Sequence, residues 1–144
     1  MTPLELALCI AIAGGGGEPV RVPTDRFTLS WTHSIEKVEW REDWTVREEG
    51  IRPAVARVKG SGAGMEPPPG SRLEAGWWVY EPRIPAQERV VLAASGFTAE
   101  HTLCVAGDCR PLNDWAGRAA GDERPVEFFA CNRRLPRSPP VSGR

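Results

Sequence analysis

The strongest constraint in this sequence is an alternation of large and small side chains that repeats every second residue. Between Phe27 and Ser34, bulky residues alternate with small hydroxyl residues. Between Val38 and Arg47, a second run places tryptophan, valine and one glutamate on one face and mostly charged residues on the other. Successive side chains of a β-strand point to opposite faces, so this pattern is typical of strands with one buried face. The sequence therefore predicts two neighbouring, half-buried strands.

The two runs are predicted to form an antiparallel hairpin. With a turn at residues 34–37, the numbers of facing residues sum to 71, and the buried face then fixes the register. This register places His33 and Glu42 on the apolar face, where an unpaired charge is unfavourable. The pair is interpreted either as a satisfied buried contact or as part of a binding site. The predicted facing pairs are Phe27–Trp44, Leu29–Glu42, Trp31–Trp40 and His33–Val38.

Shorter segments of similar character follow, separated by many of the 15 glycines and 14 prolines. Frequent short strands separated by glycine and proline favour a sandwich or a small barrel over a βαβ fold. We therefore expect an all-β fold, a small β-sandwich or barrel of about seven to eight short antiparallel strands. The further predicted strands are residues 51–59, 77–81, 88–95, 101–105 and 126–130, and residues 113–119 could form one or two helical turns.

The N-terminal residues 1–13 contain an apolar stretch, Leu6 to Ala13, that is followed by four glycines. Its end has the small-x-small form that signal peptidase recognises, which predicts a signal peptide and export to the periplasm. Glu5 and the lack of a positive start argue against export, and a buried strand is the alternative. We expect residues 14–26 to form a linker and a first short strand, residues 27–131 the β domain, and residues 132–144 a disordered tail rich in arginine and proline.

The cysteines suggest one local disulfide. Cys104 and Cys109 flank a short turn that contains glycine and aspartate, so their side chains could meet at the end of a hairpin. Cys9 lies inside the predicted signal peptide, which leaves Cys131 unpaired and interpreted as a small buried hydrophobic residue. Three cysteines and two histidines without paired C-x-x-C spacing are a weak zinc signal, so no metal site is expected.

Charge and hydropathy argue against some classes of partner. Eighteen basic residues against nineteen acidic ones give a formal net charge of −1, so the chain lacks the basic field that nucleic-acid binding uses. No apolar run approaches the roughly 20 residues that span a bilayer as a helix, so no integral membrane segment is expected. Neither nucleic acid nor an integral membrane segment therefore enters the functional hypotheses.

A glycine-rich segment, Gly60 to Met65, ends the third predicted strand. Such a turn exposes backbone N–H groups and can form a concave anion site, although a tight β-corner is the alternative interpretation. A nucleotide-binding loop would need a helix directly after it, and the sequence Glu66-Pro67-Pro68-Pro69-Gly70 prevents one. We therefore expect no cofactor.

The segments Trp31–Lys37 (WTHSIEK), Trp40–Trp44 (WREDW) and Gly60–Met65 (GSGAGM) together resemble a small bacterial family of unknown function. Its pattern is a strand ending in His-Ser-Val-Glu-Lys, a glutamate shortly afterwards, and Gly-Ala-Gly near a proline. Its genes often lie beside TRAP-type transporters of the TAXI class, so the resemblance implies a cell-envelope protein near a solute transporter. The matching residues are His33, Ser34, Glu36, Lys37, Glu42, Gly62, Ala63 and Gly64.

Three functions are compatible with these residues. The favoured hypothesis is a non-enzymatic envelope accessory that binds a small anionic solute of the carboxylate class, or a TRAP-type transporter subunit. A small hydrolase with Ser34 as nucleophile, His33 as base and Glu42 as the orienting group is the second. A carbohydrate-binding module that stacks sugar rings on tryptophan is the third. The predicted binding residues of the favoured hypothesis are His33, Ser34, Glu36, Glu42, Gly62, Ala63 and Gly64.

Overall fold

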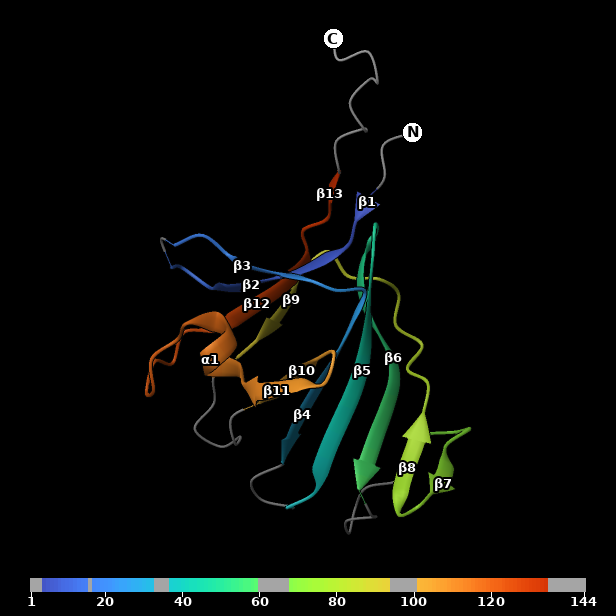
Figure 1. Cartoon of the computed structure of the whole chain (residues 1–144). Coiled ribbons are helices and arrows are strands. Elements are labelled where there is room, and N and C mark those ends of the chain that lie inside the picture. The colour runs from blue at the N-terminus through green and yellow to red at the C-terminus, as the bar shows by residue number, and fades with distance from the viewer. Residues whose placement is uncertain (1–3, 16, 33–36, 60–67, 94–100, 135–144) are drawn as a thin grey trace, which may run out of the picture.

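The computed structural model describes residues 4–15, 17–32, 37–59, 68–93 and 101–134 (Figure 1). In this part of the chain, strands dominate and build two antiparallel sheets of seven and four strands. The expected all-β, sandwich-like fold is therefore confirmed. The described residues contain thirteen short strands, more than the seven or eight expected, because several strands of two to four residues carry no clear alternation.

The larger sheet contains both predicted runs of alternating residues. Its strand order is β11-β10-β4-β5-β6-β8-β7, so sequence neighbours lie side by side except where β10 pairs with β4 and where β8 lies between β6 and β7. Every pairing in this sheet is antiparallel. Its strands are β4 (Arg26–Thr32), β5 (Glu39–Arg47), β6 (Gly50–Lys59), β7 (Arg72–Glu74), β8 (Trp77–Tyr80), β10 (Thr102–Val105) and β11 (Asp108–Pro111).

The hairpin of β4 and β5 has the register that the sequence predicts. Phe27 faces Trp44, Leu29 faces Glu42, and Trp31 faces Trp40. The fourth predicted pair includes His33, which lies outside the described residues. A β-bulge in the pairing of β5 with β6, between Asp43 and Trp44, shifts the register of β6 without moving the apolar face.

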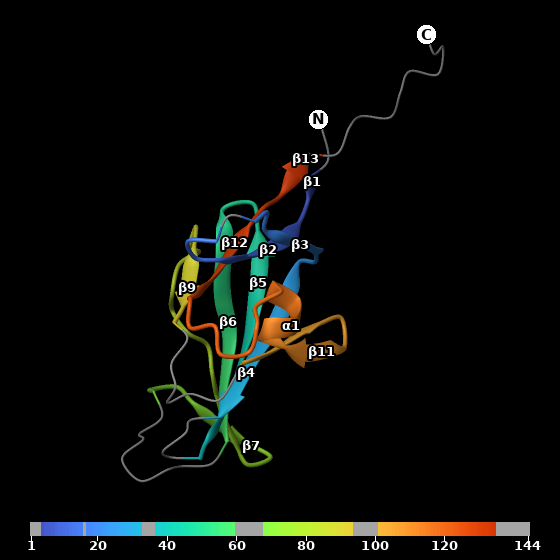
Figure 2. The same cartoon turned by 90° about the vertical axis from the view of Figure 1, so that its left-hand side faces the viewer.

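The smaller sheet combines three strands from the two ends of the chain with one strand from residues 90–92. Its order is β3-β2-β12-β9, and it lies across the upper part of the larger sheet (Figures 1 and 2). A separate pair, β1 (Leu4–Glu5) with β13 (Arg133–Arg134), joins the described ends. The strands of the smaller sheet are β2 (Ala7–Ile12), β3 (Val20–Pro23), β9 (Val90–Leu92) and β12 (Val126–Ala130).

The apolar N-terminal stretch forms an inner strand of this sheet. Leu8 and Ile10 of β2 are almost completely buried, and β2 pairs with β3 on one side and β12 on the other. Removal of residues 1–13 as a signal peptide stays a prediction, and it would take β2 out of the middle of the sheet. The short strand expected within residues 14–26 is β3, and residues 135–144 of the expected disordered tail lie outside the described residues.

The core lies where the two sheets face each other. Phe27 stacks on Trp44 with ring centroids 5.8 Å apart, and it contacts Phe128 of the smaller sheet at the same distance. Among the described residues, no polar or charged residue is fully buried. This contact between aromatic rings joins the sheets, since the inner face of each strand carries its large apolar residues.

All four cysteines form disulfides. The expected Cys104–Cys109 bond is present at the β10–β11 hairpin, where Ala106 and Gly107 both have the positive φ that a two-residue turn requires. The second bond, Cys9–Cys131, corrects the prediction that Cys131 is an unpaired buried residue. That prediction assigned Cys9 to a separate segment, whereas the antiparallel pairing of β2 with β12 brings the two cysteines together.

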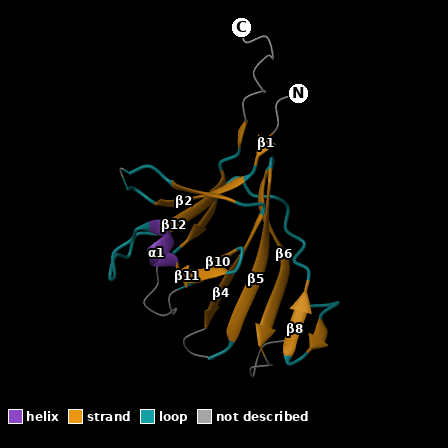
Figure 3. Ribbon diagram, viewed as in Figure 1, coloured by secondary structure: helices purple, strands orange, loops and turns teal. Residues whose placement is uncertain are grey.

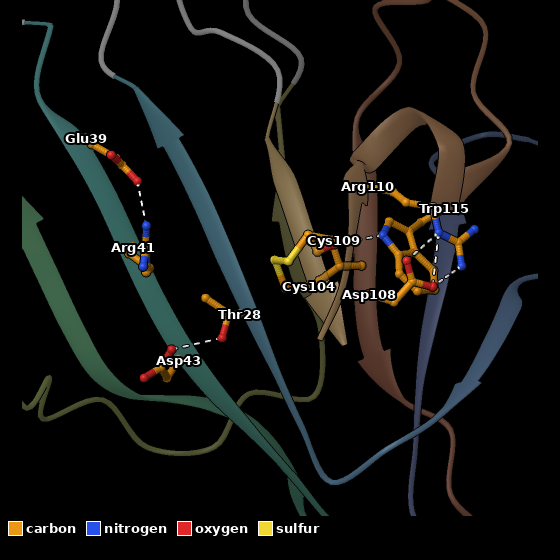
Figure 4. Close-up of a disulfide and its surroundings, with 10 residues drawn as sticks. Thr28, Glu39, Arg41, Asp43, Cys104, Asp108, Cys109, Arg110 and Trp115 are labelled. Carbon is orange, nitrogen blue, oxygen red and sulfur yellow. Dashed lines mark hydrogen bonds and ion pairs between the residues drawn. A yellow bond between two sulfur atoms is a disulfide. The ribbon is translucent and has the colours of Figure 1, made fainter. Parts of the chain in front are cut away.

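The predicted helical turn is α1 (Leu112–Ala116), which Figure 3 shows at the side of the strands. Gly117 ends it in the left-handed conformation, a common helix terminator. Trp115 extends from α1 to the β10–β11 hairpin, where its Nε1 donates a hydrogen bond to the Leu103 carbonyl at 2.9 Å (Figure 4). In the described part of the chain, no helix is long and apolar enough to cross a membrane.

Candidate functional site

Of the seven predicted binding residues, only Glu42 belongs to the described part of the chain. The strands that lead into the two predicted motifs, β4 and β6, both run antiparallel to β5. They therefore run parallel to each other, and their last residues, Thr32 and Lys59, lie at the same end of the larger sheet. The remaining predicted residues lie outside the described residues: His33, Ser34, Glu36, Gly62, Ala63 and Gly64.

Glu42 lies on the inner face of the larger sheet, as its alternating position predicts. It faces Leu29 on β4 and Ala56 on β6, and Trp44 Nε1 donates a hydrogen bond to its Oε1 at 3.2 Å. Burial raises the pKa of the Glu42 carboxyl above its ordinary value, and the Trp44 hydrogen bond only partly opposes this change. Burial, followed by the charge of Glu42, also raises the pKa of Tyr80.

The surroundings of Glu42 are aromatic and apolar. Trp31 and Trp40 stack with ring centroids 6.1 Å apart, and His101 lies 5.1 Å from Trp31. Trp40 Nε1 is buried and has no hydrogen-bond partner within the described residues. An anion placed beside Glu42 would be repelled whenever this carboxyl is ionised, so the inner face is a poor site for an anionic ligand.

The outer face of the larger sheet carries ion pairs and cations. Asp43 accepts a hydrogen bond from Thr28 Oγ1 at 2.9 Å (Figure 4) and pairs with Arg57 Nη1 at 2.5 Å. The Arg41 guanidinium and the Lys59 ammonium each lie 4.9 Å from the centroid of the Trp77 ring. These contacts order the charged side chains on the outer surface of β5, β6 and β8.

A basic cavity of about 530 Å³ lies at the β6–β8 side of the larger sheet. Three arginines line it: Arg52 from β6, Arg72 from β7, and Arg83 from the segment that follows β8. Glu81 is the acidic residue of the lining, and Val55 and Pro69 are among its apolar residues. We call this cavity the arginine pocket, and its lining carries three positive side chains against one negative.

The three guanidinium groups of the arginine pocket have few competing partners. Arg52 Nε donates to the Ile84 carbonyl at 3.3 Å. Arg72 Nε lies 3.4 Å from Glu74 Oε2, a pair in which both side chains are more than half exposed, so it holds the arginine only weakly. Arg83 forms no ion pair with any other described residue. Guanidinium groups with unused donors bind carboxylates and phosphates in a two-pronged geometry.

No residue of the arginine pocket is among the binding residues predicted from the sequence. Its arginines lie in three separate segments, and none belongs to a recognisable motif. The available signal was the alternation within β6, which places Arg52 and Val55 on the outer face on either side of a bulge. That pattern could not reveal which later residues would lie beside them, because this depends on β7 and β8 folding back along β6.

Residues 27–112 match the model of a protein family described as Domain of unknown function (DUF1850). The chain belongs to this family. The match runs from β4 to the start of α1 and so contains the larger sheet, Glu42 and all three arginines of the pocket. Strands β1, β2, β3, β12 and β13 lie outside it. The expected membership of a family of unknown function is thus confirmed, whereas the expected transporter neighbourhood stays a prediction. No curated protein and no solved structure was found to be similar to the chain.

Proposed function

We propose that this DUF1850 protein is a non-enzymatic accessory of the cell envelope that binds a small anionic solute of the carboxylate class in the arginine pocket. The convergence of Arg52, Arg72 and Arg83 on one open cavity carries the proposal. A carboxylate there would accept charge-assisted hydrogen bonds, which are about twice as strong as neutral ones. Because the lining has three cationic groups, a dicarboxylate can use more of them than a monocarboxylate.

The two predicted motifs, around His33 and around Gly62, have a secondary role in the proposed binding of the anion. In the sequence, His33 and Ser34 follow β4 and residues 62–64 follow β6, and these two strands end at the same end of the larger sheet. A shared role for these residues stays a prediction. Glu42 projects from the inner face, whereas the pocket residues Arg72 and Val55 belong to the outer face, and Tyr80 is the lining residue whose pKa is raised by burial and then by the charge of Glu42. We therefore assign the anion to the arginine pocket and leave the loop residues as predicted contacts.

A position in the periplasm, or another exported location, is part of the same proposal. The Cys104–Cys109 disulfide supports it, because structural disulfides persist in oxidising compartments and are rare in the cytosol. The Cys9–Cys131 disulfide adds to this support where residues 1–13 stay on the exported chain, since cleavage as a signal peptide would remove Cys9. The resemblance to a family encoded beside TAXI-class TRAP transporters is the support for a transporter subunit as a partner. Copurification of the tagged full chain with that transporter from membranes tests the partner, and failure to copurify after cross-linking argues against it.

The binding proposal is tested by thermal denaturation of the full chain in succinate, glutarate and glutamate. A ligand at one hundred times its Kd stabilises a protein by about 2.7 kcal/mol, so a Tm rise of several degrees is expected. Arg72→Gln and Arg83→Gln should each remove most of this rise, while Arg26→Gln, which replaces an arginine that does not line the pocket, should preserve it. An unchanged rise in both pocket variants would contradict the assignment.

The two alternative functions have less support from the described residues. For a sugar-binding module, tryptophan faces should be open, but Trp77 lies against two cations and the Arg110 guanidinium lies 4.1 Å from the centroid of the Trp115 ring. For a hydrolase, Glu42 should orient His33, and its hydrogen bond from Trp44 occupies one carboxylate oxygen. Inactivity of the wild type towards a panel of esters would eliminate the hydrolase.

A further inference from the structure

We infer that the anion bound by this protein is amphipathic, a carboxylate with an apolar body, and this inference rests on the proposed function. A second cavity of about 550 Å³ adjoins the arginine pocket. The two cavities share Pro69, Tyr80, Glu81, Pro82 and Arg83 in their linings. A molecule whose charged end occupies the first cavity therefore extends naturally into the second.

The second cavity is more apolar than the first, because among the described residues of its lining Arg83 is the one arginine and Tyr80 and Glu81 are the other polar residues. Its lining adds Pro68 and Ile84 to the shared residues, and Ile84 is an exposed large hydrophobic residue, 45% accessible. Prolines have no backbone N–H donor, so Pro68, Pro69 and Pro82 present the hydrocarbon of their rings without an amide donor to satisfy. We call this cavity the proline groove, and its chemistry suits an alkyl or aryl group.

Hydrogen bonds hold both walls of the proline groove. The Pro68 carbonyl accepts from Ser71 N at 3.1 Å and from Ser71 Oγ at 2.5 Å. The Ile84 carbonyl accepts from Arg52 Nε at 3.3 Å, which joins the far wall of the groove to the arginine pocket. A groove fixed in this way costs little conformational entropy on binding, and this favours a preformed site over one created by the ligand.

Arg83 lies at the junction and lines both cavities. With its guanidinium available to a carboxylate and its methylene stem to an apolar chain, it defines the orientation of the ligand. The carboxylate lies towards Arg52 and Arg72, and the hydrocarbon lies towards Ile84. A small, fully polar dicarboxylate would leave the proline groove unused, so the natural ligand is expected to bind more tightly than succinate.

The experiment measures the affinity of the full chain for acetate, butyrate and hexanoate by NMR titration at constant ionic strength. Each methylene buried in the groove is expected to raise affinity by about two- to fourfold, from the transfer free energy of a methylene group. The Ile84 methyl resonance should shift with hexanoate and stay in place with acetate. Affinity that is independent of chain length, with acetate still bound, would overturn the inference and leave the proposed function intact.

Three variants distinguish the binding of the carboxylate in the arginine pocket from the binding of the apolar chain in the proline groove. Ile84→Ser should flatten the chain-length dependence while acetate affinity is preserved, and Val91→Ser, which changes an exposed apolar residue of β9 outside both cavities, should have no effect. Arg72→Gln should weaken binding of every acid in the series by at least tenfold. Undetectable binding of all three acids and of succinate would overturn the proposed function, and with it the inference.

Discussion

Glu42 and the pocket arginines illustrate how the same sheet gives charged side chains opposite surroundings. Glu42 projects from the inner face, where Leu29 and Ala56 flank it and Trp44 donates a hydrogen bond to its carboxylate. Arg72 projects from the outer face, where its side chain is 58% exposed and remains available to a ligand. The alternation of side chains along a strand determines this difference, since successive residues point to the core and to the solvent in turn.

The buried position of Glu42 predicts a pH-dependent stability. Its pKa is raised in the folded protein, so the stability that it contributes is present below its ordinary pKa and is lost as the pH rises through the raised value. Glu42→Gln should therefore match the wild type at low pH and exceed it at neutral pH, by at most about 1 kcal/mol because the carboxyl remains partly exposed. Urea denaturation at several pH values measures this difference.

A matched control for this prediction is Glu49→Gln, which changes an exposed glutamate in the β5–β6 turn. This variant should follow the wild type across the same pH range. If Glu42→Gln were less stable than the wild type at neutral pH, the hydrogen bond from Trp44 would outweigh the burial of charge, and the interpretation of Glu42 would be wrong.

At the scale of elements, the start of β6 depends on one glycine. Gly50 has φ of +139°, a conformation that side chains disfavour, and a Cβ at this position would lie 2.9 Å from the carbonyl carbon of Gln87. The approach is close because Ile51 and Gln87 exchange two backbone hydrogen bonds, of 3.0 and 2.7 Å. This bridge holds the segment between β8 and β9 against β6, and that segment also contains Arg83 and Ile84.

Gly50→Ala should consequently destabilise the fold by about 2 kcal/mol or more, through backbone strain and loss of the bridge to Gln87. Gly17→Ala is the control, because its new Cβ meets nothing within 4 Å and its φ is not positive. Thermal denaturation of the two variants tests the difference. Equal melting temperatures would mean that the Gln87 segment moves away without cost.

At the scale of the whole molecule, the two disulfides act over very different lengths of chain. Cys9–Cys131 joins residues 122 positions apart and connects β2 to the residue after β12, whereas Cys104–Cys109 closes a hairpin with a separation of 5. The first therefore ties the N-terminal strand to the C-terminal part of the same sheet. The second reinforces a contact that the hairpin already makes.

Loss of the two bonds should have unequal effects. Restriction of the unfolded chain predicts about 5 kcal/mol for Cys9–Cys131 and about 2 kcal/mol for Cys104–Cys109. The double variant Cys9→Ser/Cys131→Ser should thus lower the free energy of unfolding more than Cys104→Ser/Cys109→Ser, which is its control. Guanidinium denaturation of both variants provides the measurement, and a larger effect at the hairpin would refute the chain-entropy explanation.

The sequence by itself determined those features that depend on residues close together in the chain. The alternation of large and small side chains from Phe27 to Thr32 and from Glu39 to Arg47 predicted the hairpin and its register. A shift by one residue would move the tryptophan side chains from the buried face to the solvent. The short turn between Cys104 and Cys109 predicted their disulfide for a similar reason. Glu42 was placed correctly on the inner face by the same periodicity.

Only the tertiary structure decided the partners of the remote segments. The apolar N-terminal stretch predicts an export signal first and a buried strand only as the alternative. Its pairing with β12 and the bond from Cys9 to Cys131 depend on residues more than a hundred positions away. The arginine pocket likewise exists only after β7 and β8 fold back beside β6. Local patterns fix which face of a strand is buried, but the free energy that selects a neighbouring strand comes from surface shared by distant parts of the chain.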